Sequence, residues 1–141
     1  MAALAVVTSS PSSVEGGHLV IARALTTAAR DAGHEAHLVI TPDGQFGRQV
    51  SSYVTTWRTD VAAAAGGKVD QVISLRYLSY AVRHPAHVCW LNHTMREYYD
   101  LWPRFSRSLS PQGRAKERLK KTLIRAVDRW LLTSNVSEVV A

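Results

Sequence analysis

Residues 4–40 read LAVVTSSPSSVEGGHLVIARALTTAARDAGHEAHLVI, and this stretch contains a complete β-α-β pattern. Residues 4–7 form a continuous apolar run, which is typical of a strand buried on both faces of a parallel sheet. Apolar residues then recur at helical spacing over residues 21–32, and Gly33 stands where a helix C-cap belongs. Residues 37–40 predict a second strand, closed by a turn. Units of this kind are right-handed in nearly all proteins.

Helices and strands continue to alternate through the middle of the chain. Residues 49–58 predict a second helix, and the small residues at 62–67 predict a helix end followed by a loop. Residues 71–74 and 87–91 are short apolar runs that predict further strands. The alternation predicts an α/β protein, a Rossmann-like three-layer sandwich with a mainly parallel sheet, as one domain over residues 1–141.

The last third of the chain predicts a long helix and a final strand. Ser110 and Pro111 form an N-cap with proline at the first helical position, and residues 136–141 are strand-like. The apolar stripe of this helix contains Ala115, Leu119, Leu123, Ala126, Val127 and Trp130. We expect Leu119, Leu123 and Trp130 to lie in the core. A neighbouring face is basic and carries Arg114, Arg118, Lys121, Arg125 and Arg129.

Composition excludes several classes of protein. The chain has 141 residues, 46% of them hydrophobic and 20% charged, which fits a globular domain and argues against disorder. The single cysteine, Cys89, excludes an internal disulfide and a four-thiolate zinc site and fits a reducing cytosol. No apolar run reaches the ~20 residues of a membrane span, and the N-terminus lacks the basic region of a signal peptide.

Positive charge is concentrated in one segment. The net charge is +6, and residues 104–129 alone hold nine basic residues against Glu117 and Asp128. This basic patch has three interpretations: a solvated helix face, contact with anionic lipid head groups, or contact with nucleic acid. Nucleic acid is the least favoured partner, because no recognised binding motif accompanies the charge.

The loop before the first helix is a candidate anion site. Gly16, Gly17 and His18 lead into the helix, where glycines let backbone N–H groups approach an anion and the helix N-terminus favours negative charge. The loop lacks the G-x-G-x-x-G pattern of NAD-type sites, and the chain has no Walker loop. A tight turn, with Glu15 complementing the helix dipole, is the structural alternative.

A second candidate lies directly after the strand at residues 87–91. Asn92 and His93 fall at the expected mouth of the sheet, and Arg96 adds a fixed positive charge. A loop held by hydrogen bonds and aromatic packing is the alternative. We expect no metal site, because the H-E-A-H segment lacks ligand spacing and His87 and Cys89 share a strand face without a third ligand. Nucleophilic catalysis is not indicated either, since Cys89 lies in an apolar run and no G-x-S-x-G elbow is present.

Three pieces in order resemble the N-terminal half of a family 4 (group 1) glycosyltransferase of the GT-B fold. They are ALAVVTSSPSSVEGGHLVIARAL at 3–25, DAGHEAHLVI at 31–40 and HVCWLNHTMREYYDLW at 87–102. The resemblance implies sugar transfer from a nucleotide-sugar donor to a sugar or lipid acceptor, without a metal or other cofactor and usually with retention of configuration. This domain would form the acceptor side of the cleft.

The resemblance also assigns roles to individual residues. Gly16 and Gly17 match the loop that approaches the donor diphosphate, and His93 matches the histidine that contacts the donor sugar near the reacting centre. His18, Asn92, Arg96 and Tyr98 are donor or acceptor contacts inferred by neighbourhood. The basic patch is similar to those by which some lipid-modifying members dock to anionic membranes. A departing nucleotide diphosphate requires such backbone donors and positive charge.

The family's second domain, which binds the nucleotide and carries an E-x7-E motif, has no counterpart in this sequence. We therefore expect a fragment, a truncated product or half of a split enzyme, inactive alone, cytoplasmic and peripheral to the inner face of the membrane. Two alternatives stay open: a non-catalytic nucleotide- or anion-binding α/β module, and a membrane- or nucleic-acid-binding adaptor that uses the basic helix.

Overall fold

The computed structural model describes residues 1–10, 17–42, 49–91, 99 and 101–140. Within these ranges the strands are β1 (Ala3–Ser10), β2 (Glu35–Pro42), β3 (Gln71–Ser74), β4 (His87–Trp90) and β5 (Glu138–Val140). The helical elements are α1 (Gly17–Asp31), α2 (Gln49–Arg58), α3 (Val61–Ala65), the 3-10 turn η1 (Ser79–Ala81), α4 (Trp102–Arg107), α5 (Pro111–Trp130) and the π-helical turn η3 (Leu131–Asn135). The predicted α/β class is confirmed.

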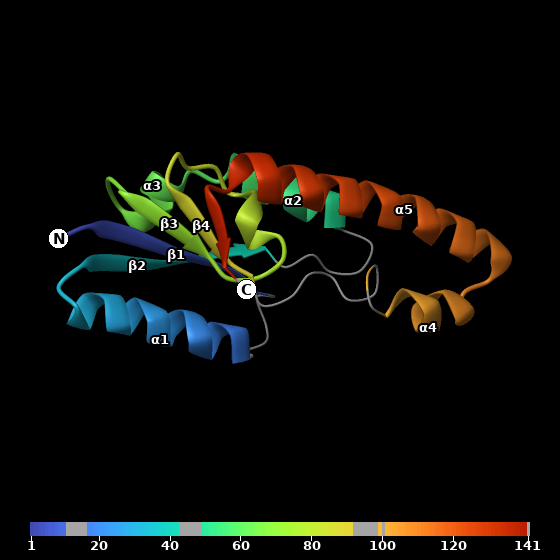
Figure 1. Cartoon of the computed structure of the whole chain (residues 1–141), viewed down its shortest axis with the longest axis horizontal. Coiled ribbons are helices and arrows are strands. Elements are labelled where there is room, and N and C mark those ends of the chain that lie inside the picture. The colour runs from blue at the N-terminus through green and yellow to red at the C-terminus, as the bar shows by residue number, and fades with distance from the viewer. Residues whose placement is uncertain (11–16, 43–48, 92–98, 100, 141) are drawn as a thin grey trace.

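All five strands are parallel and lie in the order β2-β1-β3-β4-β5. The chain moves from β1 to one side and then returns to the other side, so right-handed crossovers require helices on opposite faces. Helix α1 accordingly covers one face, while α2, α3 and α5 lie on the other (Figure 1). The result is a Rossmann-like three-layer sandwich. Strand order reverses between β1 and β3, which makes their carboxyl ends the topological switch point.

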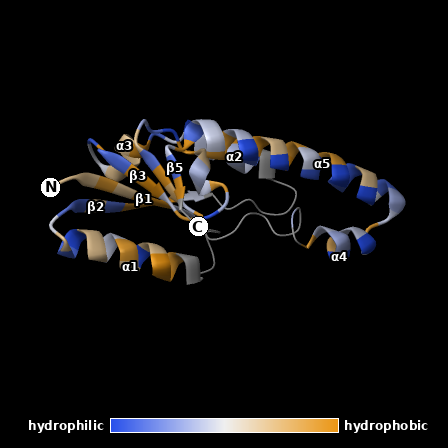
Figure 2. Cartoon of the chain, in the orientation of Figure 1, coloured by the Kyte–Doolittle hydropathy of each residue, from blue (hydrophilic) through white to orange (hydrophobic). Residues whose placement is uncertain are grey.

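Alternation along β1 divides the core between the two faces. Val6 packs with Ala22 of α1, whereas Val7 packs in a separate cluster with Val61 of α3. Both valines are fully buried, which explains why residues 4–7 of β1 are all apolar (Figure 2). Gly33 ends α1 with a φ of +91°, and the amide of His34 donates to the carbonyl of Ala29 at 3.0 Å. The predicted glycine cap is therefore confirmed.

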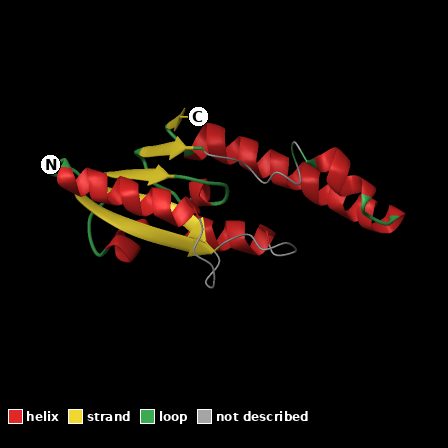
Figure 3. Cartoon of the chain, turned by 90° about the horizontal axis from the view of Figure 1, so that it is seen from below, coloured by secondary structure: helices red, strands yellow, loops and turns green. Residues whose placement is uncertain are grey.

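The predicted elements are confirmed with different bounds at several ends. Helix α2 covers the predicted residues 49–58, but residues 61–65 form a helix of their own, α3, capped by the Asp60 side chain. The predicted cap of α5 is confirmed, because the amide of Gly113 donates to Oγ of Ser110 at 3.1 Å. Helix α4 was not predicted. Helices α4 and α5 together form a hairpin that projects past the carboxyl ends of the strands (Figures 1 and 3).

The expectation for the apolar side of α5 was wrong. Leu119, Leu123 and Trp130 are 74%, 49% and 51% exposed, so they do not belong to the core. The buried side of the helix instead presents Ile124 together with Glu117 and Asp128. Helical periodicity identifies an apolar stripe but not what covers it. Here the buried side of the helix contacts Tyr53, Tyr80 and Tyr99 through Asp128.

Candidate functional site

The first candidate site lies at the carboxyl ends of β1 and β3, where open α/β sheets bind their ligands. Oγ of Ser9 donates to the carbonyl of Tyr77 at 3.0 Å, and Nη1 of Arg76 donates to the carbonyl of Ser9 at 3.1 Å. The Arg76 guanidinium also lies 4.8 Å from the centre of the Tyr77 ring. These contacts fix the segment after β3 against the end of β1 and hold a permanent positive charge at this edge.

Backbone strain marks the turn that carries Arg76. Leu78 has a φ of +73° and is the only non-glycine residue with positive φ in the described ranges. Its side chain is fully buried, and Ser79 closes the turn by donating its hydroxyl to the carbonyl of Arg76 at 2.6 Å. A leucine in this conformation is an outlier that its surroundings must stabilise, and such outliers cluster at ligand-binding turns.

Thr8 supplies a buried hydroxyl to the same edge. Its side chain is fully buried, and Oγ1 has no hydrogen-bond partner in the described part of the chain. On one face of β1, Leu4 packs with Ala29 and Val6 packs with Ala22. Because side chains alternate between the two faces of a strand, Thr8 is the next residue on this face and points toward the first turn of α1. An unsatisfied buried hydroxyl costs about 1–3 kcal/mol, which favours a role toward a ligand.

The alternation along β1 directs Thr8 toward the end at which helix α1 begins. Gly17 is its first residue, and residues 17–20, its first turn, contain no acidic side chain. The predicted residues Gly16, Asn92, His93, Arg96 and Tyr98 lie outside the described residues, as does the side chain of His18. The described part of the predicted donor site therefore consists of Gly17, to which the structure adds Thr8 and Arg76.

The basic patch lies elsewhere, along α5. Arg114, Arg118, Arg125 and Arg129 are exposed, and the Lys121 ammonium lies 4.5 Å from the centre of the Trp102 ring. The Arg125 guanidinium stands 4.7 Å above the Tyr99 ring. Partial desolvation, followed by the charges of Arg125 and Arg118, lowers the pKa of Lys121. The patch is thus a surface of the projecting hairpin.

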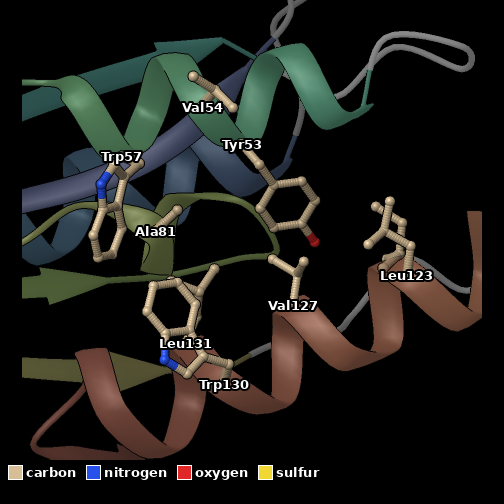
Figure 4. Close-up of a pocket in the computed structure, with 9 residues that line it drawn as sticks. Tyr53, Val54, Trp57, Ala81, Leu123, Val127, Trp130 and Leu131 are labelled. Carbon is tan, nitrogen blue, oxygen red and sulfur yellow. The ribbon is translucent and has the colours of Figure 1, made fainter.

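An apolar groove separates α2 from α5 (Figure 4). It has a volume of about 310 Å³ and is lined by Tyr53, Val54, Trp57, Ala81, Leu123, Ile124, Val127, Trp130 and Leu131. The Trp57 and Trp130 rings close one end, with their centres 5.1 Å apart. This groove could not be predicted from local sequence patterns, because its two walls come from helices far apart in the chain.

Asp128 accepts a hydrogen bond from Tyr53, which lines this groove, and it was not predicted from the sequence either. Its carboxylate accepts hydrogen bonds from the hydroxyls of Tyr53 and Tyr80 and, at 2.7 Å, from that of Tyr99. Burial raises the pKa of Asp128, and the three hydrogen bonds oppose that shift. Burial and then the Asp128 charge raise the pKa of Tyr53, so its hydroxyl stays a donor. A lone aspartate between Ile124 and Leu131 on a helix is the signal that could have found the cluster.

A second buried polar group joins β3, β4 and η3. Nδ1 of His87 lies 3.2 Å from the carbonyl of Asn135, which can only accept, so Nε2 accepts the Ser74 hydroxyl at 2.8 Å. Burial lowers the pKa of His87 to about 4, with a smaller contribution from the nearby His84. The imidazole is therefore neutral at neutral pH. Both side chains are fully buried, so this serine–histidine pair holds the sheet rather than reaching a substrate.

His87 and Cys89 face the same side of β4, as predicted, and the Cys89 thiol is buried. Burial raises the pKa of that thiol, which disfavours the reactive thiolate. Within the described ranges no group of three or more His, Cys, Asp or Glu side chains is placed to hold a metal ion. Among the helices of those ranges, none combines the length and the apolar character that crossing a membrane requires.

Comparison of the chain with protein-family models, with curated proteins and with solved structures gives no match.

Proposed function

We propose that this chain is the acceptor-side domain of a nucleotide-sugar-dependent glycosyltransferase, in which the β1–β3 edge holds an anionic group of the donor. The observation that carries the proposal is the unpartnered Thr8 hydroxyl, which is fully buried near the carboxyl end of β1. The resemblance of residues 3–25, 31–40 and 87–102 to the N-terminal half of such enzymes supports the choice of reaction.

The chemistry of the edge suits a leaving nucleotide diphosphate. As the sugar leaves the donor, negative charge develops on the diphosphate oxygens. The Arg76 charge, the Thr8 hydroxyl and the backbone amides at the start of α1 would oppose that charge without a metal ion. In this proposal His93 contacts the donor sugar near the reacting centre, and a second domain completes the cleft.

Binding by the chain is tested with a panel of uridine and guanosine diphosphate sugars, followed by amide NMR shifts. We expect shifts at Thr8, Ser9, Gly17 and Arg76. The Thr8→Val variant removes a hydroxyl that stabilises nothing within the described chain, so it should fold as well as the parent. A lost hydrogen bond to a charged group contributes about 1.5–3 kcal/mol, so affinity should fall roughly tenfold or more.

The matched control is Arg58→Ala, at the exposed end of α2, which should leave the affinity unchanged. Binding that Thr8→Val does not weaken, or shifts confined to other edges of the sheet, would contradict the proposal. Equal affinity for a nucleotide diphosphate with and without its sugar would favour a non-catalytic nucleotide-binding module instead.

A second candidate function is peripheral attachment to an anionic membrane. The observation that favours it is that both acidic residues among residues 104–129, Glu117 and Asp128, are buried, at 6% and 1% exposure. The exposed charges of the hairpin over these residues are therefore all positive, and the exposed Leu119 lies among them. Vesicles with and without acidic phospholipid, at low and high salt, test this candidate. Vesicle binding that depends neither on the acidic phospholipid content nor on the salt concentration would overturn this candidate.

A further inference from the structure

The α2–α5 groove has the size of a small-molecule site. Its volume of about 310 Å³ is roughly twice that of a ~150 Å³ cavity that binds benzene and lies at the lower end of the ~300–1,000 Å³ of ligand pockets. The walls are aliphatic or aromatic, and the one hydroxyl among the lining residues, that of Tyr53, already donates to Asp128. Apart from the indole N–H groups of Trp57 and Trp130, the lining is apolar, so the part of a ligand that enters should be hydrocarbon.

Positive charge stands at both ends of the groove. Beyond Leu123, the same side of α5 carries Lys120 and the exposed Lys116, at the spacing of successive helical turns. Nζ of Lys120 lies 3.6 Å from Oε1 of the buried Glu117, and Lys116 adds a second, exposed cation one turn away. At the other end, the Arg83 guanidinium lies 5.0 Å above the Trp57 ring.

The groove is directed toward the carboxyl edge of the sheet. The η3 turn that follows α5 lies at the amino end of β4, where Nδ1 of His87 is 3.2 Å from the carbonyl oxygen of Asn135. Moving back along α5 from Trp130 to Leu123 therefore leads toward the carboxyl ends of the strands, and the hairpin continues past them (Figures 1 and 3). A chain lying in the groove would have its head group beyond Leu123, on the face of the sheet opposite α1 and toward its carboxyl edge.

We propose that this groove binds the hydrocarbon chain of a single anionic amphiphile, whose head group lies against Lys116 and Lys120. A second copy of the chain fits the surface less well, because self-association would bring like charges together at the same ends. The binding rests on the groove alone, whereas the identification of the amphiphile as the acceptor of a sugar rests on the proposed function.

The test measures binding of dodecyl phosphate below its critical micelle concentration. Inorganic phosphate is the control for the head group alone, and dodecyl maltoside is the control for the same hydrocarbon chain on an uncharged head group. Calorimetry should show saturable one-to-one binding, and methyl NMR shifts should be confined to Val54, Leu123, Ile124, Val127 and Leu131. Inorganic phosphate should not shift these methyl groups. Dodecyl maltoside should shift the same methyl groups with lower affinity.

Variants separate the groove from its charges. Val127→Phe fills the groove and should weaken the binding of dodecyl phosphate roughly tenfold or more. Val20→Phe, at an exposed position on α1, should leave the affinity unchanged. If Val127→Phe does not fold, Val54→Trp blocks the exposed mouth and should have the same effect. A double variant, Lys116→Glu and Lys120→Glu, should lower the affinity for dodecyl phosphate but not the affinity for dodecyl maltoside.

Several outcomes would overturn the proposal: binding that does not saturate, methyl shifts spread over the surface, or filled-groove variants that bind as tightly as the parent. A dimer in sedimentation equilibrium that Val127→Phe abolishes would show that the groove is an interface between copies, which also overturns it. Thr8→Val should leave the affinity for dodecyl phosphate unchanged. An error in the proposed groove site can therefore be distinguished from an error in the proposed nucleotide-sugar site.

Discussion

Tyr99 and Asp128 are joined by a hydrogen bond in which the tyrosine hydroxyl donates to Oδ2 of the carboxylate at 2.7 Å. Tyr53 of α2 and Tyr80 of η1 donate to the other oxygen. One carboxylate on α5 therefore joins three segments that come from different parts of the chain. It is 1% exposed, so its charge is stabilised by these donors rather than by water.

Replacing Asp128 by leucine should destabilise the fold by about 2–4 kcal/mol, because the hydroxyls of Tyr53 and Tyr80 lose their acceptor inside the protein. Urea unfolding measures the change. Combining Asp128→Leu with Tyr53→Phe and Tyr80→Phe should recover much of the loss, since only the half-buried Tyr99 hydroxyl is then left without its acceptor. A single leucine variant as stable as the parent would show that the cluster is dispensable.

Acidification should destabilise the fold through His87. Its pKa is about 4 in the folded protein against an ordinary 6.5, so between these values the unfolded chain binds more protons. The contribution of His87 to the free energy of unfolding is fully present above pH 6.5. It decreases as the pH is lowered, and about 3 kcal/mol is lost below pH 4. Asp128, whose pKa is raised, acts in the opposite sense.

The measurement is the free energy of unfolding from pH 7 to pH 4 in the parent and in His87→Asn. The variant retains Asp128 and loses the imidazole, so its stability should depend less steeply on pH across this range. Parallel curves for the two proteins would contradict the assignment of the neutral imidazole to the fold.

Two residues on α5 test which side of the helix is buried. Ile124→Ala should cost about 2–5 kcal/mol, because Ile124 is 2% exposed and its truncation leaves a cavity. Leu119→Ala, at 74% exposure, should change stability by less than about 0.5 kcal/mol. The free energy of unfolding of both variants is measured by heat or urea. Equal losses of stability in the two variants would show that the Leu119 side of the helix belongs to the core.

Gly33 should resist replacement because of its backbone conformation alone. Its φ is +91° and a Cβ would meet nothing within 4 Å, so Gly33→Ala should cost about 1–2 kcal/mol from strain without a clash. Gly67 has equally open surroundings without positive φ, which makes Gly67→Ala the matched control with little expected loss. A neutral Gly33→Ala variant would show that this helix end relaxes freely.

The sequence alone predicted the α/β class, the first β-α-β unit and the caps at Ser110 and Gly33. These features depend on local periodicity and on backbone preferences of individual residues, and both can be read from neighbours in the chain. The candidate site was only partly accessible. Gly17 was predicted from a local glycine pattern, whereas Thr8 and Arg76 gain meaning only from the strand order.

Tertiary structure decided which face of α5 is buried and what its two acidic residues do. Helical spacing is the same for a stripe that faces the sheet and for one that faces solvent, so the apolar residues of α5 carried no information about their partner. Only the packed chain brings Tyr53, Tyr80 and Tyr99 around Asp128 and leaves Leu119 exposed among positive charges. The reason is physical: burial and hydrogen bonding between distant segments depend on topology, which local sequence patterns do not encode.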